Sequence, residues 1–99
     1  MRTTVQSDER RPALILARES ELTYLSCVTV APITSTVRGI PSEVPVGVRN
    51  GLGHDSVVSC DNVTTVPREA VHSTIGYFFD DREPDLLRAI SDALELVLP

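Results

Sequence analysis

Residues 11–16, Arg11-Pro12-Ala13-Leu14-Ile15-Leu16, place an arginine–proline pair directly before a continuous apolar run. Such a run, bounded by a proline, is typical of a short buried strand, and we expect that strand to cover residues 12–18. Residues 22–31 are rich in Leu, Tyr, Val and Thr, which favours a second strand. Because Pro32 has no N–H to donate, we expect this second strand to be interrupted there or to lie on an edge.

The rest of the chain up to residue 79 predicts short strands joined by turns. Residues 33–42 are rich in Thr and Ser and contain a glycine and a proline, which indicates a surface loop. Pro45 favours an edge position for the strand that contains it. We expect strands at 2–6 (a short edge strand), 43–47, 55–60 and 73–79, a turn at 49–53, and one helical turn at 66–71.

The C-terminal segment predicts an α-helix. Pro84 suits a first helical turn, and acidic residues gather there, where they favour the helix dipole. One apolar face is predicted by the spacing of three and four residues between Leu87, Ile90, Leu94 and Val97. Five or six short strands followed by one helix imply a small, curled, mainly antiparallel sheet.

The composition is that of one small globular domain. The chain has 99 residues, of which 41% are hydrophobic, so we expect residues 1–99 to fold as a single unit. No apolar stretch approaches the length of a membrane span, and the N-terminus lacks a signal-peptide core, which predicts a cytoplasmic protein without a membrane partner. A core this small leaves much surface exposed, so we expect a homodimer.

The charge is acidic but unevenly spread. The formal net charge is −5, and residues 80–99 hold six acidic side chains against two arginines, so the remaining chain is near neutral. Every positive charge is an arginine, a residue that suits bidentate phosphate contacts. A near-neutral body predicts recognition of a few nucleotides rather than a broad electrostatic grip on nucleic acid.

The two cysteines give no sign of a metal site. Cys27 and Cys60 each lie in an apolar, strand-like segment, with no CxxC motif and no cluster of Cys and His. The sequence therefore predicts no zinc, no other metal and no cofactor. We expect both thiols to be reduced and buried.

The residues at the ends of the two leading strands suit the gripping of a phosphodiester. An arginine that precedes a buried strand is held by a rigid scaffold, and its guanidinium can stabilise the extra negative charge of a phosphorane-like transition state. The alternative for Arg11 is a surface arginine that caps a strand. Hydroxyl groups follow the second strand at Thr34, Ser35 and Thr36. These side chains need no metal to bind a phosphate.

Four stretches in this order and spacing resemble the MazF/PemK family of toxin endoribonucleases from bacterial toxin–antitoxin pairs. They are Arg11–Leu16, Val30–Gly39, Pro41–Val46 and Asp55–Val63, with a weaker match at Ile75-Gly76 before the C-terminal helix. The resemblance covers roughly residues 10–97. It implies a mainly β (α+β) fold, an SH3-like small antiparallel barrel with a packed C-terminal α-helix.

The resemblance also implies which residues form the site. Arg11 and Thr34 occupy the places of the family's catalytic arginine and threonine. The expected substrate-binding residues are Arg10, Ser35, Thr36, Arg38 and Asp61. For these the alternatives remain ordinary loop chemistry, a solvated loop arginine at Arg38, and a turn aspartate at Asp61 that bonds the backbone. Both histidines, His54 and His72, lie in polar connections, and we expect them to be solvated.

The implied activity is metal-independent, sequence-selective cleavage of single-stranded RNA. Attack of a ribose 2′-OH on the adjacent phosphorus would give a 2′,3′-cyclic phosphate and a free 5′-OH. Arginine is a poor base, so the group that removes the proton is left open. Relatives often have a long loop before the arginine–proline pair, whereas only ten residues precede Arg11 here.

The expected partners are RNA, a second copy of the chain and an acidic MazE-like antitoxin. We expect the RNA groove to span both chains of the dimer. We expect the antitoxin's disordered tail to lie across the arginines that face RNA, while the acidic helix faces elsewhere. These arginines are Arg10, Arg11, Arg38 and Arg49.

Two alternative functions come from other classes. A gyrase-poisoning toxin of the CcdB type shares the fold but typically relies on a tryptophan near the end of its terminal helix, and this chain has no Trp. A non-catalytic SH3-like binding module predicts an aromatic groove. The aromatic side chains that could form one are Tyr24, Tyr77, Phe78 and Phe79.

Overall fold

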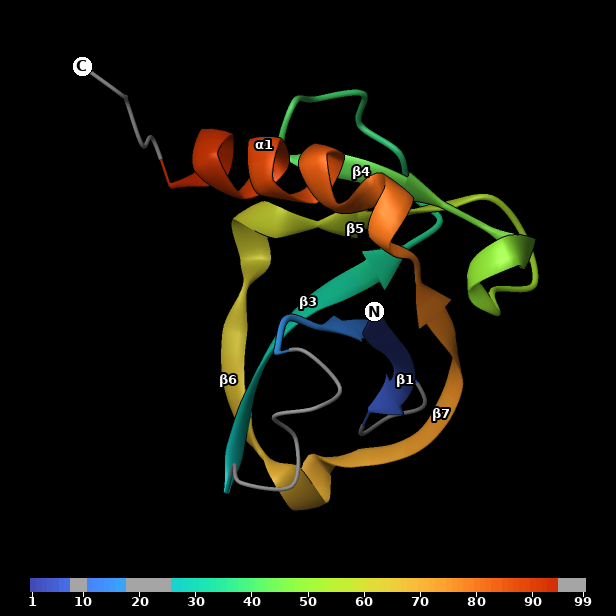
Figure 1. Ribbon diagram of the computed structural model, residues 1–99, viewed down its shortest axis with the longest axis vertical. Coiled ribbons are helices and arrows are strands. Elements are labelled where there is room, and N and C mark those ends of the chain that lie inside the picture. Colours follow the sequence, from blue (N-terminus) through green and yellow to red (C-terminus); the bar gives the residue numbers. More distant parts are fainter. Residues whose placement is uncertain (8–10, 18–25, 95–99) are drawn as a thin grey trace.

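The computed structural model describes residues 1–7, 11–17 and 26–94, which form one curled antiparallel sheet and a C-terminal helix (Figure 1). The strands are β1 (Arg2–Ser7), β2 (Pro12–Ile15), β3 (Cys27–Thr34), β4 (Glu43–Val46), β5 (Ser56–Ser59), β6 (Thr64–Pro67) and β7 (Val71–Phe78). Short 3-10 turns are η3 (Val48–Asn50), η4 (Cys60–Asn62), η5 (Arg68–Ala70) and η6 (Asp80–Arg82), and the helix is α1 (Glu83–Ala93). The predicted mainly β fold with one terminal helix is confirmed.

The long strand β3 organises the sheet by pairing with three other strands. The strand order is β4-β5-β3-β2-β1-β7, and β6 also pairs with β3. One edge of β3 contacts β2, while the other edge contacts β6 over Cys27–Val30 and then β5 over Ile33 and Thr34. This change of partner lets the sheet curl into a half-barrel, around which β6, η5 and β7 form an outer rim in Figure 1.

Two expectations about the strands are wrong. β3 continues through Pro32 to Thr34, so these residues do not begin a loop. Pro32 lies where the neighbouring strand changes from β6 to β5, a break in the ladder where a missing N–H is tolerated. β1 is not an edge strand but lies between β2 and β7. In this inner position its threonines, which look polar in sequence, are buried: Thr3 and Thr4 are 4% and 0% exposed.

Other strand predictions differ only in their ends. β4 lies at the end of the sheet, as Pro45 predicts, and η5 follows Pro67 where one helical turn is predicted. β2 ends at Ile15, which is earlier than predicted, and β5 lies within the predicted 55–60. Residues 22–25, the start of the second predicted strand, lie outside the described residues, as does Tyr24.

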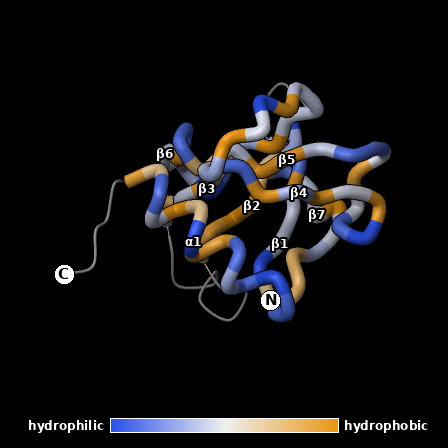
Figure 2. Tube along the Cα trace, turned by 90° about the horizontal axis from the view of Figure 1, so that it is seen from above, coloured by the Kyte–Doolittle hydropathy of each residue, from blue (hydrophilic) through white to orange (hydrophobic). Residues whose placement is uncertain are grey.

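β2 is buried on both faces because the sheet separates two hydrophobic clusters. Leu14 belongs to the cluster that packs under α1, whereas Ala13 and Ile15 belong to the cluster inside the curl. A strand in this position needs a continuous apolar run, which explains the sequence at residues 13–15. Figure 2 shows hydrophobic residues along the strands and a helix that alternates between hydrophobic and hydrophilic stretches.

The predicted apolar face of the helix is wrong by one residue. Leu87 and Leu94 are 55% and 61% exposed, while Leu86 and Ala89 are buried and Ile90 is partly buried. The buried residues also recur at spacings of three and four, and α1 packs against β4 and η4. Val97 lies outside the described residues. Within the described ranges, no helix has the length and hydropathy needed to cross a bilayer.

Only one cysteine behaves as expected. Cys60 is 1% exposed, and burial, followed by the nearby charge of Asp61, raises the pKa of its thiol to about 11. Cys27 is exposed, because it stands at the beginning of β3, where the strand leaves the core.

The segment between β4 and β5 is fastened across β1 and β7 by Asn50. The hydroxyl of Thr4 donates to the Asn50 carbonyl at 2.7 Å, and the Asn50 amide donates to the Tyr77 carbonyl at 2.9 Å. The N–H of Gly47 donates to the Asn50 side-chain oxygen at 3.1 Å. These bonds fix both the start and the path of residues 47–56, which form one wall of the site described next.

Candidate active site

The ends of β2 and β3 bring the predicted catalytic pair together. Ala13 pairs with Pro32 in the antiparallel ladder between these strands. Continuing that register by two residues places Arg11 opposite Thr34. The two residues therefore lie at the same end of adjacent strands, and both line one pocket.

This pocket, which we call the Arg11 pocket, has a volume of about 430 Å³. Its walls come from the start of β2, the end of β3 and the segment that leads into β5. They supply one guanidinium, one imidazole and three hydroxyl groups, and no carboxylate is among the described residues that line it. The lining residues are Arg11, Pro12, Pro32, Ile33, Thr34, Ser35, Leu52, His54 and Ser56.

Hydrogen bonds to neighbouring residues hold both catalytic candidates in place. The N–H and the hydroxyl of Ser7 both donate to the Arg11 carbonyl, at 2.8 and 2.9 Å, which closes the connection between β1 and β2. The side-chain oxygen of Thr34 accepts a hydrogen bond from the N–H of Thr36 at 3.1 Å. That contact uses the oxygen as an acceptor and leaves the Thr34 O–H available to donate to a phosphate. Thr36 is exposed and is not among the residues that line the pocket.

Arg38 and Asp61 contact each other rather than the Arg11 pocket. The Arg38 guanidinium donates to Asp61 at 2.9 Å and to Glu43 at 3.1 Å. The hydrogen bond with Asp61, followed by that with Glu43, raises the pKa of Arg38 further. The pKa of Asp61 is lowered first by Arg38 and then by Ser59, whose hydroxyl donates at 2.8 Å. Two carboxylates thus balance the charge of this predicted substrate-binding arginine.

Glu43 closes the loop over residues 35–42. Its carboxylate, in a side chain that is only 3% exposed, accepts the N–H groups of Arg38 and Gly39 at 3.0 and 2.8 Å. Desolvation raises the pKa of Glu43, but the hydrogen bonds from the backbone and side chain of Arg38 and from Gly39 outweigh it and hold this pKa below its ordinary value. Glu43 therefore fixes the loop that follows Thr34.

Replacing Glu43 with glutamine is expected to destabilise the protein at neutral pH and to reduce its sensitivity to acid. Because the pKa of Glu43 is lower in the folded state than in the unfolded state, its ionised carboxylate stabilises the fold at pH values above the unfolded-state pKa. This stabilisation is lost as the pH falls through the folded-state pKa. The denaturation midpoints of wild type and Glu43→Gln should therefore converge at pH values below the ordinary pKa range of glutamate. Hydrogen exchange at residues 38–40 measures the loop directly, and parallel midpoints at every pH would contradict this account.

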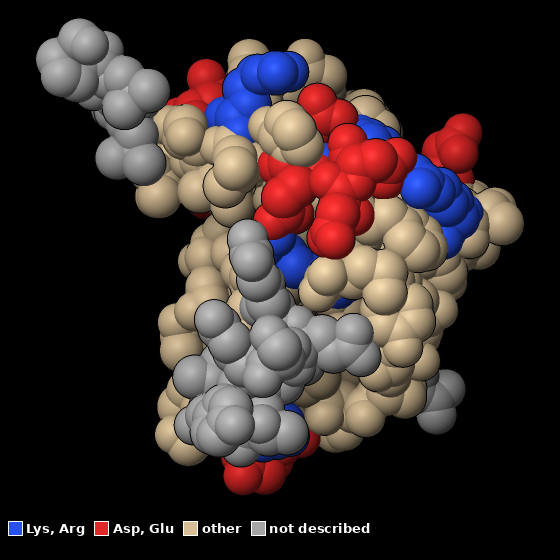
Figure 3. All heavy atoms as spheres, viewed as in Figure 1, with Lys and Arg blue, Asp and Glu red and all other residues tan. Residues whose placement is uncertain are grey.

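Arg49, which the sequence groups with the RNA-facing arginines, is paired with an acidic residue near the start of α1. Arg49 pairs with Asp81 at 3.0 Å and lies over the Phe79 ring, 4.6 Å from its centroid. Figure 3 shows acidic side chains gathered near the start of α1 with arginines beside them. The loop that carries η3 therefore brings Arg49 against the acidic side chains that precede α1. Arg10, the other predicted auxiliary contact, lies outside the described residues.

Two polar residues of the Arg11 pocket are absent from the sequence-based prediction. The sequence predicts a solvated His54, and the side chain is exposed, yet it lines the same pocket as Arg11 and Thr34. Ser56 follows it and donates its hydroxyl to the His54 carbonyl at 3.2 Å. The pairing of Thr34 with Val57 brings this segment beside β3, and the signal for that pairing is tertiary.

Comparisons with known proteins agree over nearly the whole chain. The family model described as "PemK-like, MazF-like toxin of type II toxin-antitoxin system" matches residues 2–98. The chain is 52% identical over 91 residues to endoribonuclease MazF3 of Mycobacterium tuberculosis (strain CDC 1551 / Oshkosh), covering 92% of this chain and 88% of that protein.

Solved structures give the same answer. The structure of the Mycobacterium tuberculosis toxin MazF-mt6 has a TM-score of 0.88 at 48% identity and covers 98% of both chains. A mycobacterial endoribonuclease solved in complex with its cognate antitoxin shares the fold, with a TM-score of 0.82 at 23% identity over 98% of this chain and 95% of that one. The chain therefore belongs to the PemK-like, MazF-like family of toxins of type II toxin–antitoxin systems.

Proposed function

We propose that this family member is a metal-independent endoribonuclease that cleaves single-stranded RNA through attack of the ribose 2′-OH. The observation that carries the proposal is the placement of Arg11 and Thr34 at one end of adjacent strands in the same pocket. Family membership and the 52% identity to an endoribonuclease favour RNA cleavage over gyrase poisoning and over a non-catalytic binding module.

The side chains of the pocket divide the work on the phosphate. Arg11 stabilises the negative charge that grows on the non-bridging oxygens, and Thr34 donates its O–H to one of them. Ser35 adds a hydroxyl beside them. The 2′-oxygen bonds to phosphorus as the bond to the 5′-oxygen breaks, which leaves a 2′,3′-cyclic phosphate and a 5′-OH. A single strand is required because the 2′-OH must reach an in-line position and the bases must splay apart.

The remaining predicted substrate contacts are proposed for the rim of the pocket. Thr36 is exposed next to the catalytic threonine. Arg38 can bind a backbone phosphate only if the phosphate replaces part of the ion pair between Arg38 and Asp61. The Asp61 carboxylate would then be able to accept a hydrogen bond from a nucleobase of the RNA. Arg10 is adjacent in sequence to Arg11 and is proposed as an auxiliary phosphate contact.

Cleavage is expected to survive removal of divalent ions. Within the described residues, no group of three or more His, Cys, Asp or Glu side chains is placed to hold a metal ion. Purified protein incubated with total RNA in EDTA should cut it at the same rate as in magnesium once the ionic strength is matched. The products should carry 2′,3′-cyclic phosphate and 5′-OH ends. Activity that EDTA abolishes and a divalent ion restores would overturn the mechanism.

We also propose that the chain works in the cytoplasm as a homodimer and is neutralised by an acidic, MazE-like antitoxin. The small core supports the dimer. The antitoxin complex solved for a relative supports an antitoxin partner for this chain. Sedimentation at micromolar concentration tests the dimer, and competition between antitoxin and RNA tests the shared groove.

A further inference from the structure

The cleavage step needs a proton acceptor that Arg11 and Thr34 do not provide. A guanidinium holds its proton at any pH at which the protein is folded, and a hydroxyl is too weak a base to take the 2′-OH proton. A useful general base has a pKa near the working pH, and imidazole is the side chain whose ordinary value, about 6.5, lies there.

The lining of the Arg11 pocket offers one such group. Among its described residues the nitrogen-bearing side chains are those of Arg11 and His54, and the others are hydroxyl-bearing or apolar. We infer that His54 is the general base of the reaction, which removes the proton from the attacking 2′-OH. This inference rests on the proposed RNA cleavage.

His54 reaches the pocket from a different segment of the chain than the phosphate-binding pair. Arg11 directly precedes β2 and Thr34 ends β3, whereas His54 lies in the segment before β5. Leu52 is buried, and its N–H donates to the Gly47 carbonyl at 3.2 Å, so one side of His54 is anchored in the core. Ser56 donates to the His54 carbonyl on the other side. The main chain is therefore fixed while the exposed side chain can reach a substrate.

The step balances without any additional reactant. The 2′-OH proton passes to the imidazole, the 2′-oxygen bonds to phosphorus, and the bond from phosphorus to the 5′-oxygen breaks. The departing 5′-oxygen takes a proton from water, and the imidazolium returns its proton to solvent. Arg11 lines the same pocket and stabilises the negative charge of the phosphorane-like transition state while the imidazole takes the proton.

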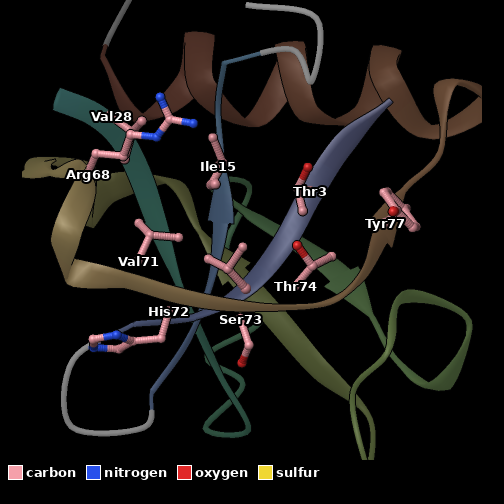
Figure 4. Close-up of a pocket in the computed structure, with 10 residues that line it drawn as sticks. Thr3, Ile15, Val28, Arg68, Val71, His72, Ser73, Thr74 and Tyr77 are labelled. Atoms are coloured by element: carbon pink, nitrogen blue, oxygen red, sulfur yellow. The ribbon is translucent and has the colours of Figure 1, made fainter. Parts of the chain in front are cut away.

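Two other titratable side chains serve as matched controls. Asp55 follows His54, but its carboxylate lies beside Gly47, 3.3 Å from where a Cβ would stand, and Asp55 does not line the pocket. His72 lines a different pocket, of about 240 Å³, and Figure 4 shows it on β7 with its ring directed away from the hydroxyls of Thr3 and Thr74. Neither residue is placed to reach the 2′-OH.

The first experiment compares single-turnover cleavage by His54→Gln, His72→Gln and Asp55→Asn across pH. His54→Gln should lose about 10²-fold in rate at neutral pH, in the range typical of a general base. At low pH the cleavage rate should rise tenfold per pH unit, because neutral imidazole is the active form. This acid limb of the pH–rate profile should be the same in wild type, His72→Gln and Asp55→Asn. His54→Gln should lose this limb, and added imidazole should partly restore His54→Ala. An unchanged limb in His54→Gln, or its loss in Asp55→Asn, would overturn the assignment.

The second experiment separates a base from an acid. RNA with a sulfur in place of the scissile 5′-oxygen has a leaving group that departs without a proton. If His54 is the base, His54→Gln should slow cleavage of the oxygen and sulfur substrates by similar factors. A loss confined to the oxygen substrate would make His54 the acid and overturn the inference.

Wild-type activity distinguishes the proposed RNA cleavage from the role of His54. If wild type fails to cut RNA, or cuts it without a cyclic phosphate, the proposed function fails. If wild type cuts as proposed while His54→Gln retains its rate and pH profile, RNA cleavage stands and only the role of His54 is refuted.

Discussion

Arg11→Ala is expected to slow RNA cleavage by about 10²–10³-fold, the usual effect of removing one preorganised charge donor. The fold should be unaffected because the Arg11 side chain is exposed, while its carbonyl still accepts from Ser7. Single-turnover rates with a saturating short RNA measure the loss, and thermal unfolding checks the fold. Arg11→Lys should recover only part of the rate, since an ammonium keeps the charge without the planar, bidentate fork.

Arg88→Ala is the matched control for the loss of one positive charge. Arg88 lies on α1, is 78% exposed and forms an ion pair with Asp85 at 3.7 Å, so its removal should leave the rate near wild type. Arg10→Ala should have a smaller effect than Arg11→Ala, because Arg10 is proposed as an auxiliary contact. If Arg10→Ala abolishes cleavage while Arg11→Ala cuts normally, the roles within the pair are reversed.

Gly76→Ala is expected to be strongly destabilising, by about 3 kcal/mol or more, because it would force two backbone segments apart. A Cβ on Gly76 would overlap the carbonyl of Asn50, and a Cβ on Gly51 would overlap the carbonyl of Ile75. Gly51 also has φ of +87°, which favours glycine. Main-chain atoms on both sides cannot rotate away as a side chain can. Urea denaturation measures the loss in free energy of unfolding.

Gly53→Ala is the control within the same segment. Nothing lies within 4 Å of the position where its Cβ would be, so its effect should stay within about 0.5 kcal/mol. Because the crossing of Gly51 over Gly76 fixes the path toward His54, Gly76→Ala should also lose cleavage activity. Equal unfolding free energies for Gly76→Ala and Gly53→Ala would show that the crossing yields easily and does not support the site.

Much of this protein follows from local sequence alone. The apolar run at residues 13–15 specifies a strand, Pro84 and its acidic neighbours specify the start of a helix, and Pro45 specifies an edge. The resemblance carried by short motifs also identifies the family, which the comparisons show. Such features are readable because propensity, proline geometry and charge near a helix end act over a few residues.

Only the tertiary structure decided which distant residues meet. Arg38 forms an ion pair with Asp61, 23 residues away, and Arg49 forms one with Asp81, 32 residues away. No local sequence pattern reveals which carboxylate balances each arginine. Likewise, the choice between Leu86 and Leu87 as the buried helix residue depends on how α1 sits over β4 and η4. Both residues fit a helical period, and the packing partner selects one.

The Arg11 pocket shows the same division. Its arginine and threonine could be named from the sequence, because each stands at the end of a strand-like segment in a recognisable motif. His54 could not, because its place depends on the pairing of β5 with β3 and on Asn50 fastening the intervening segment to β1 and β7. Strand register and backbone crossings are set by contacts between segments far apart in the chain, so they exist only once the chain has folded.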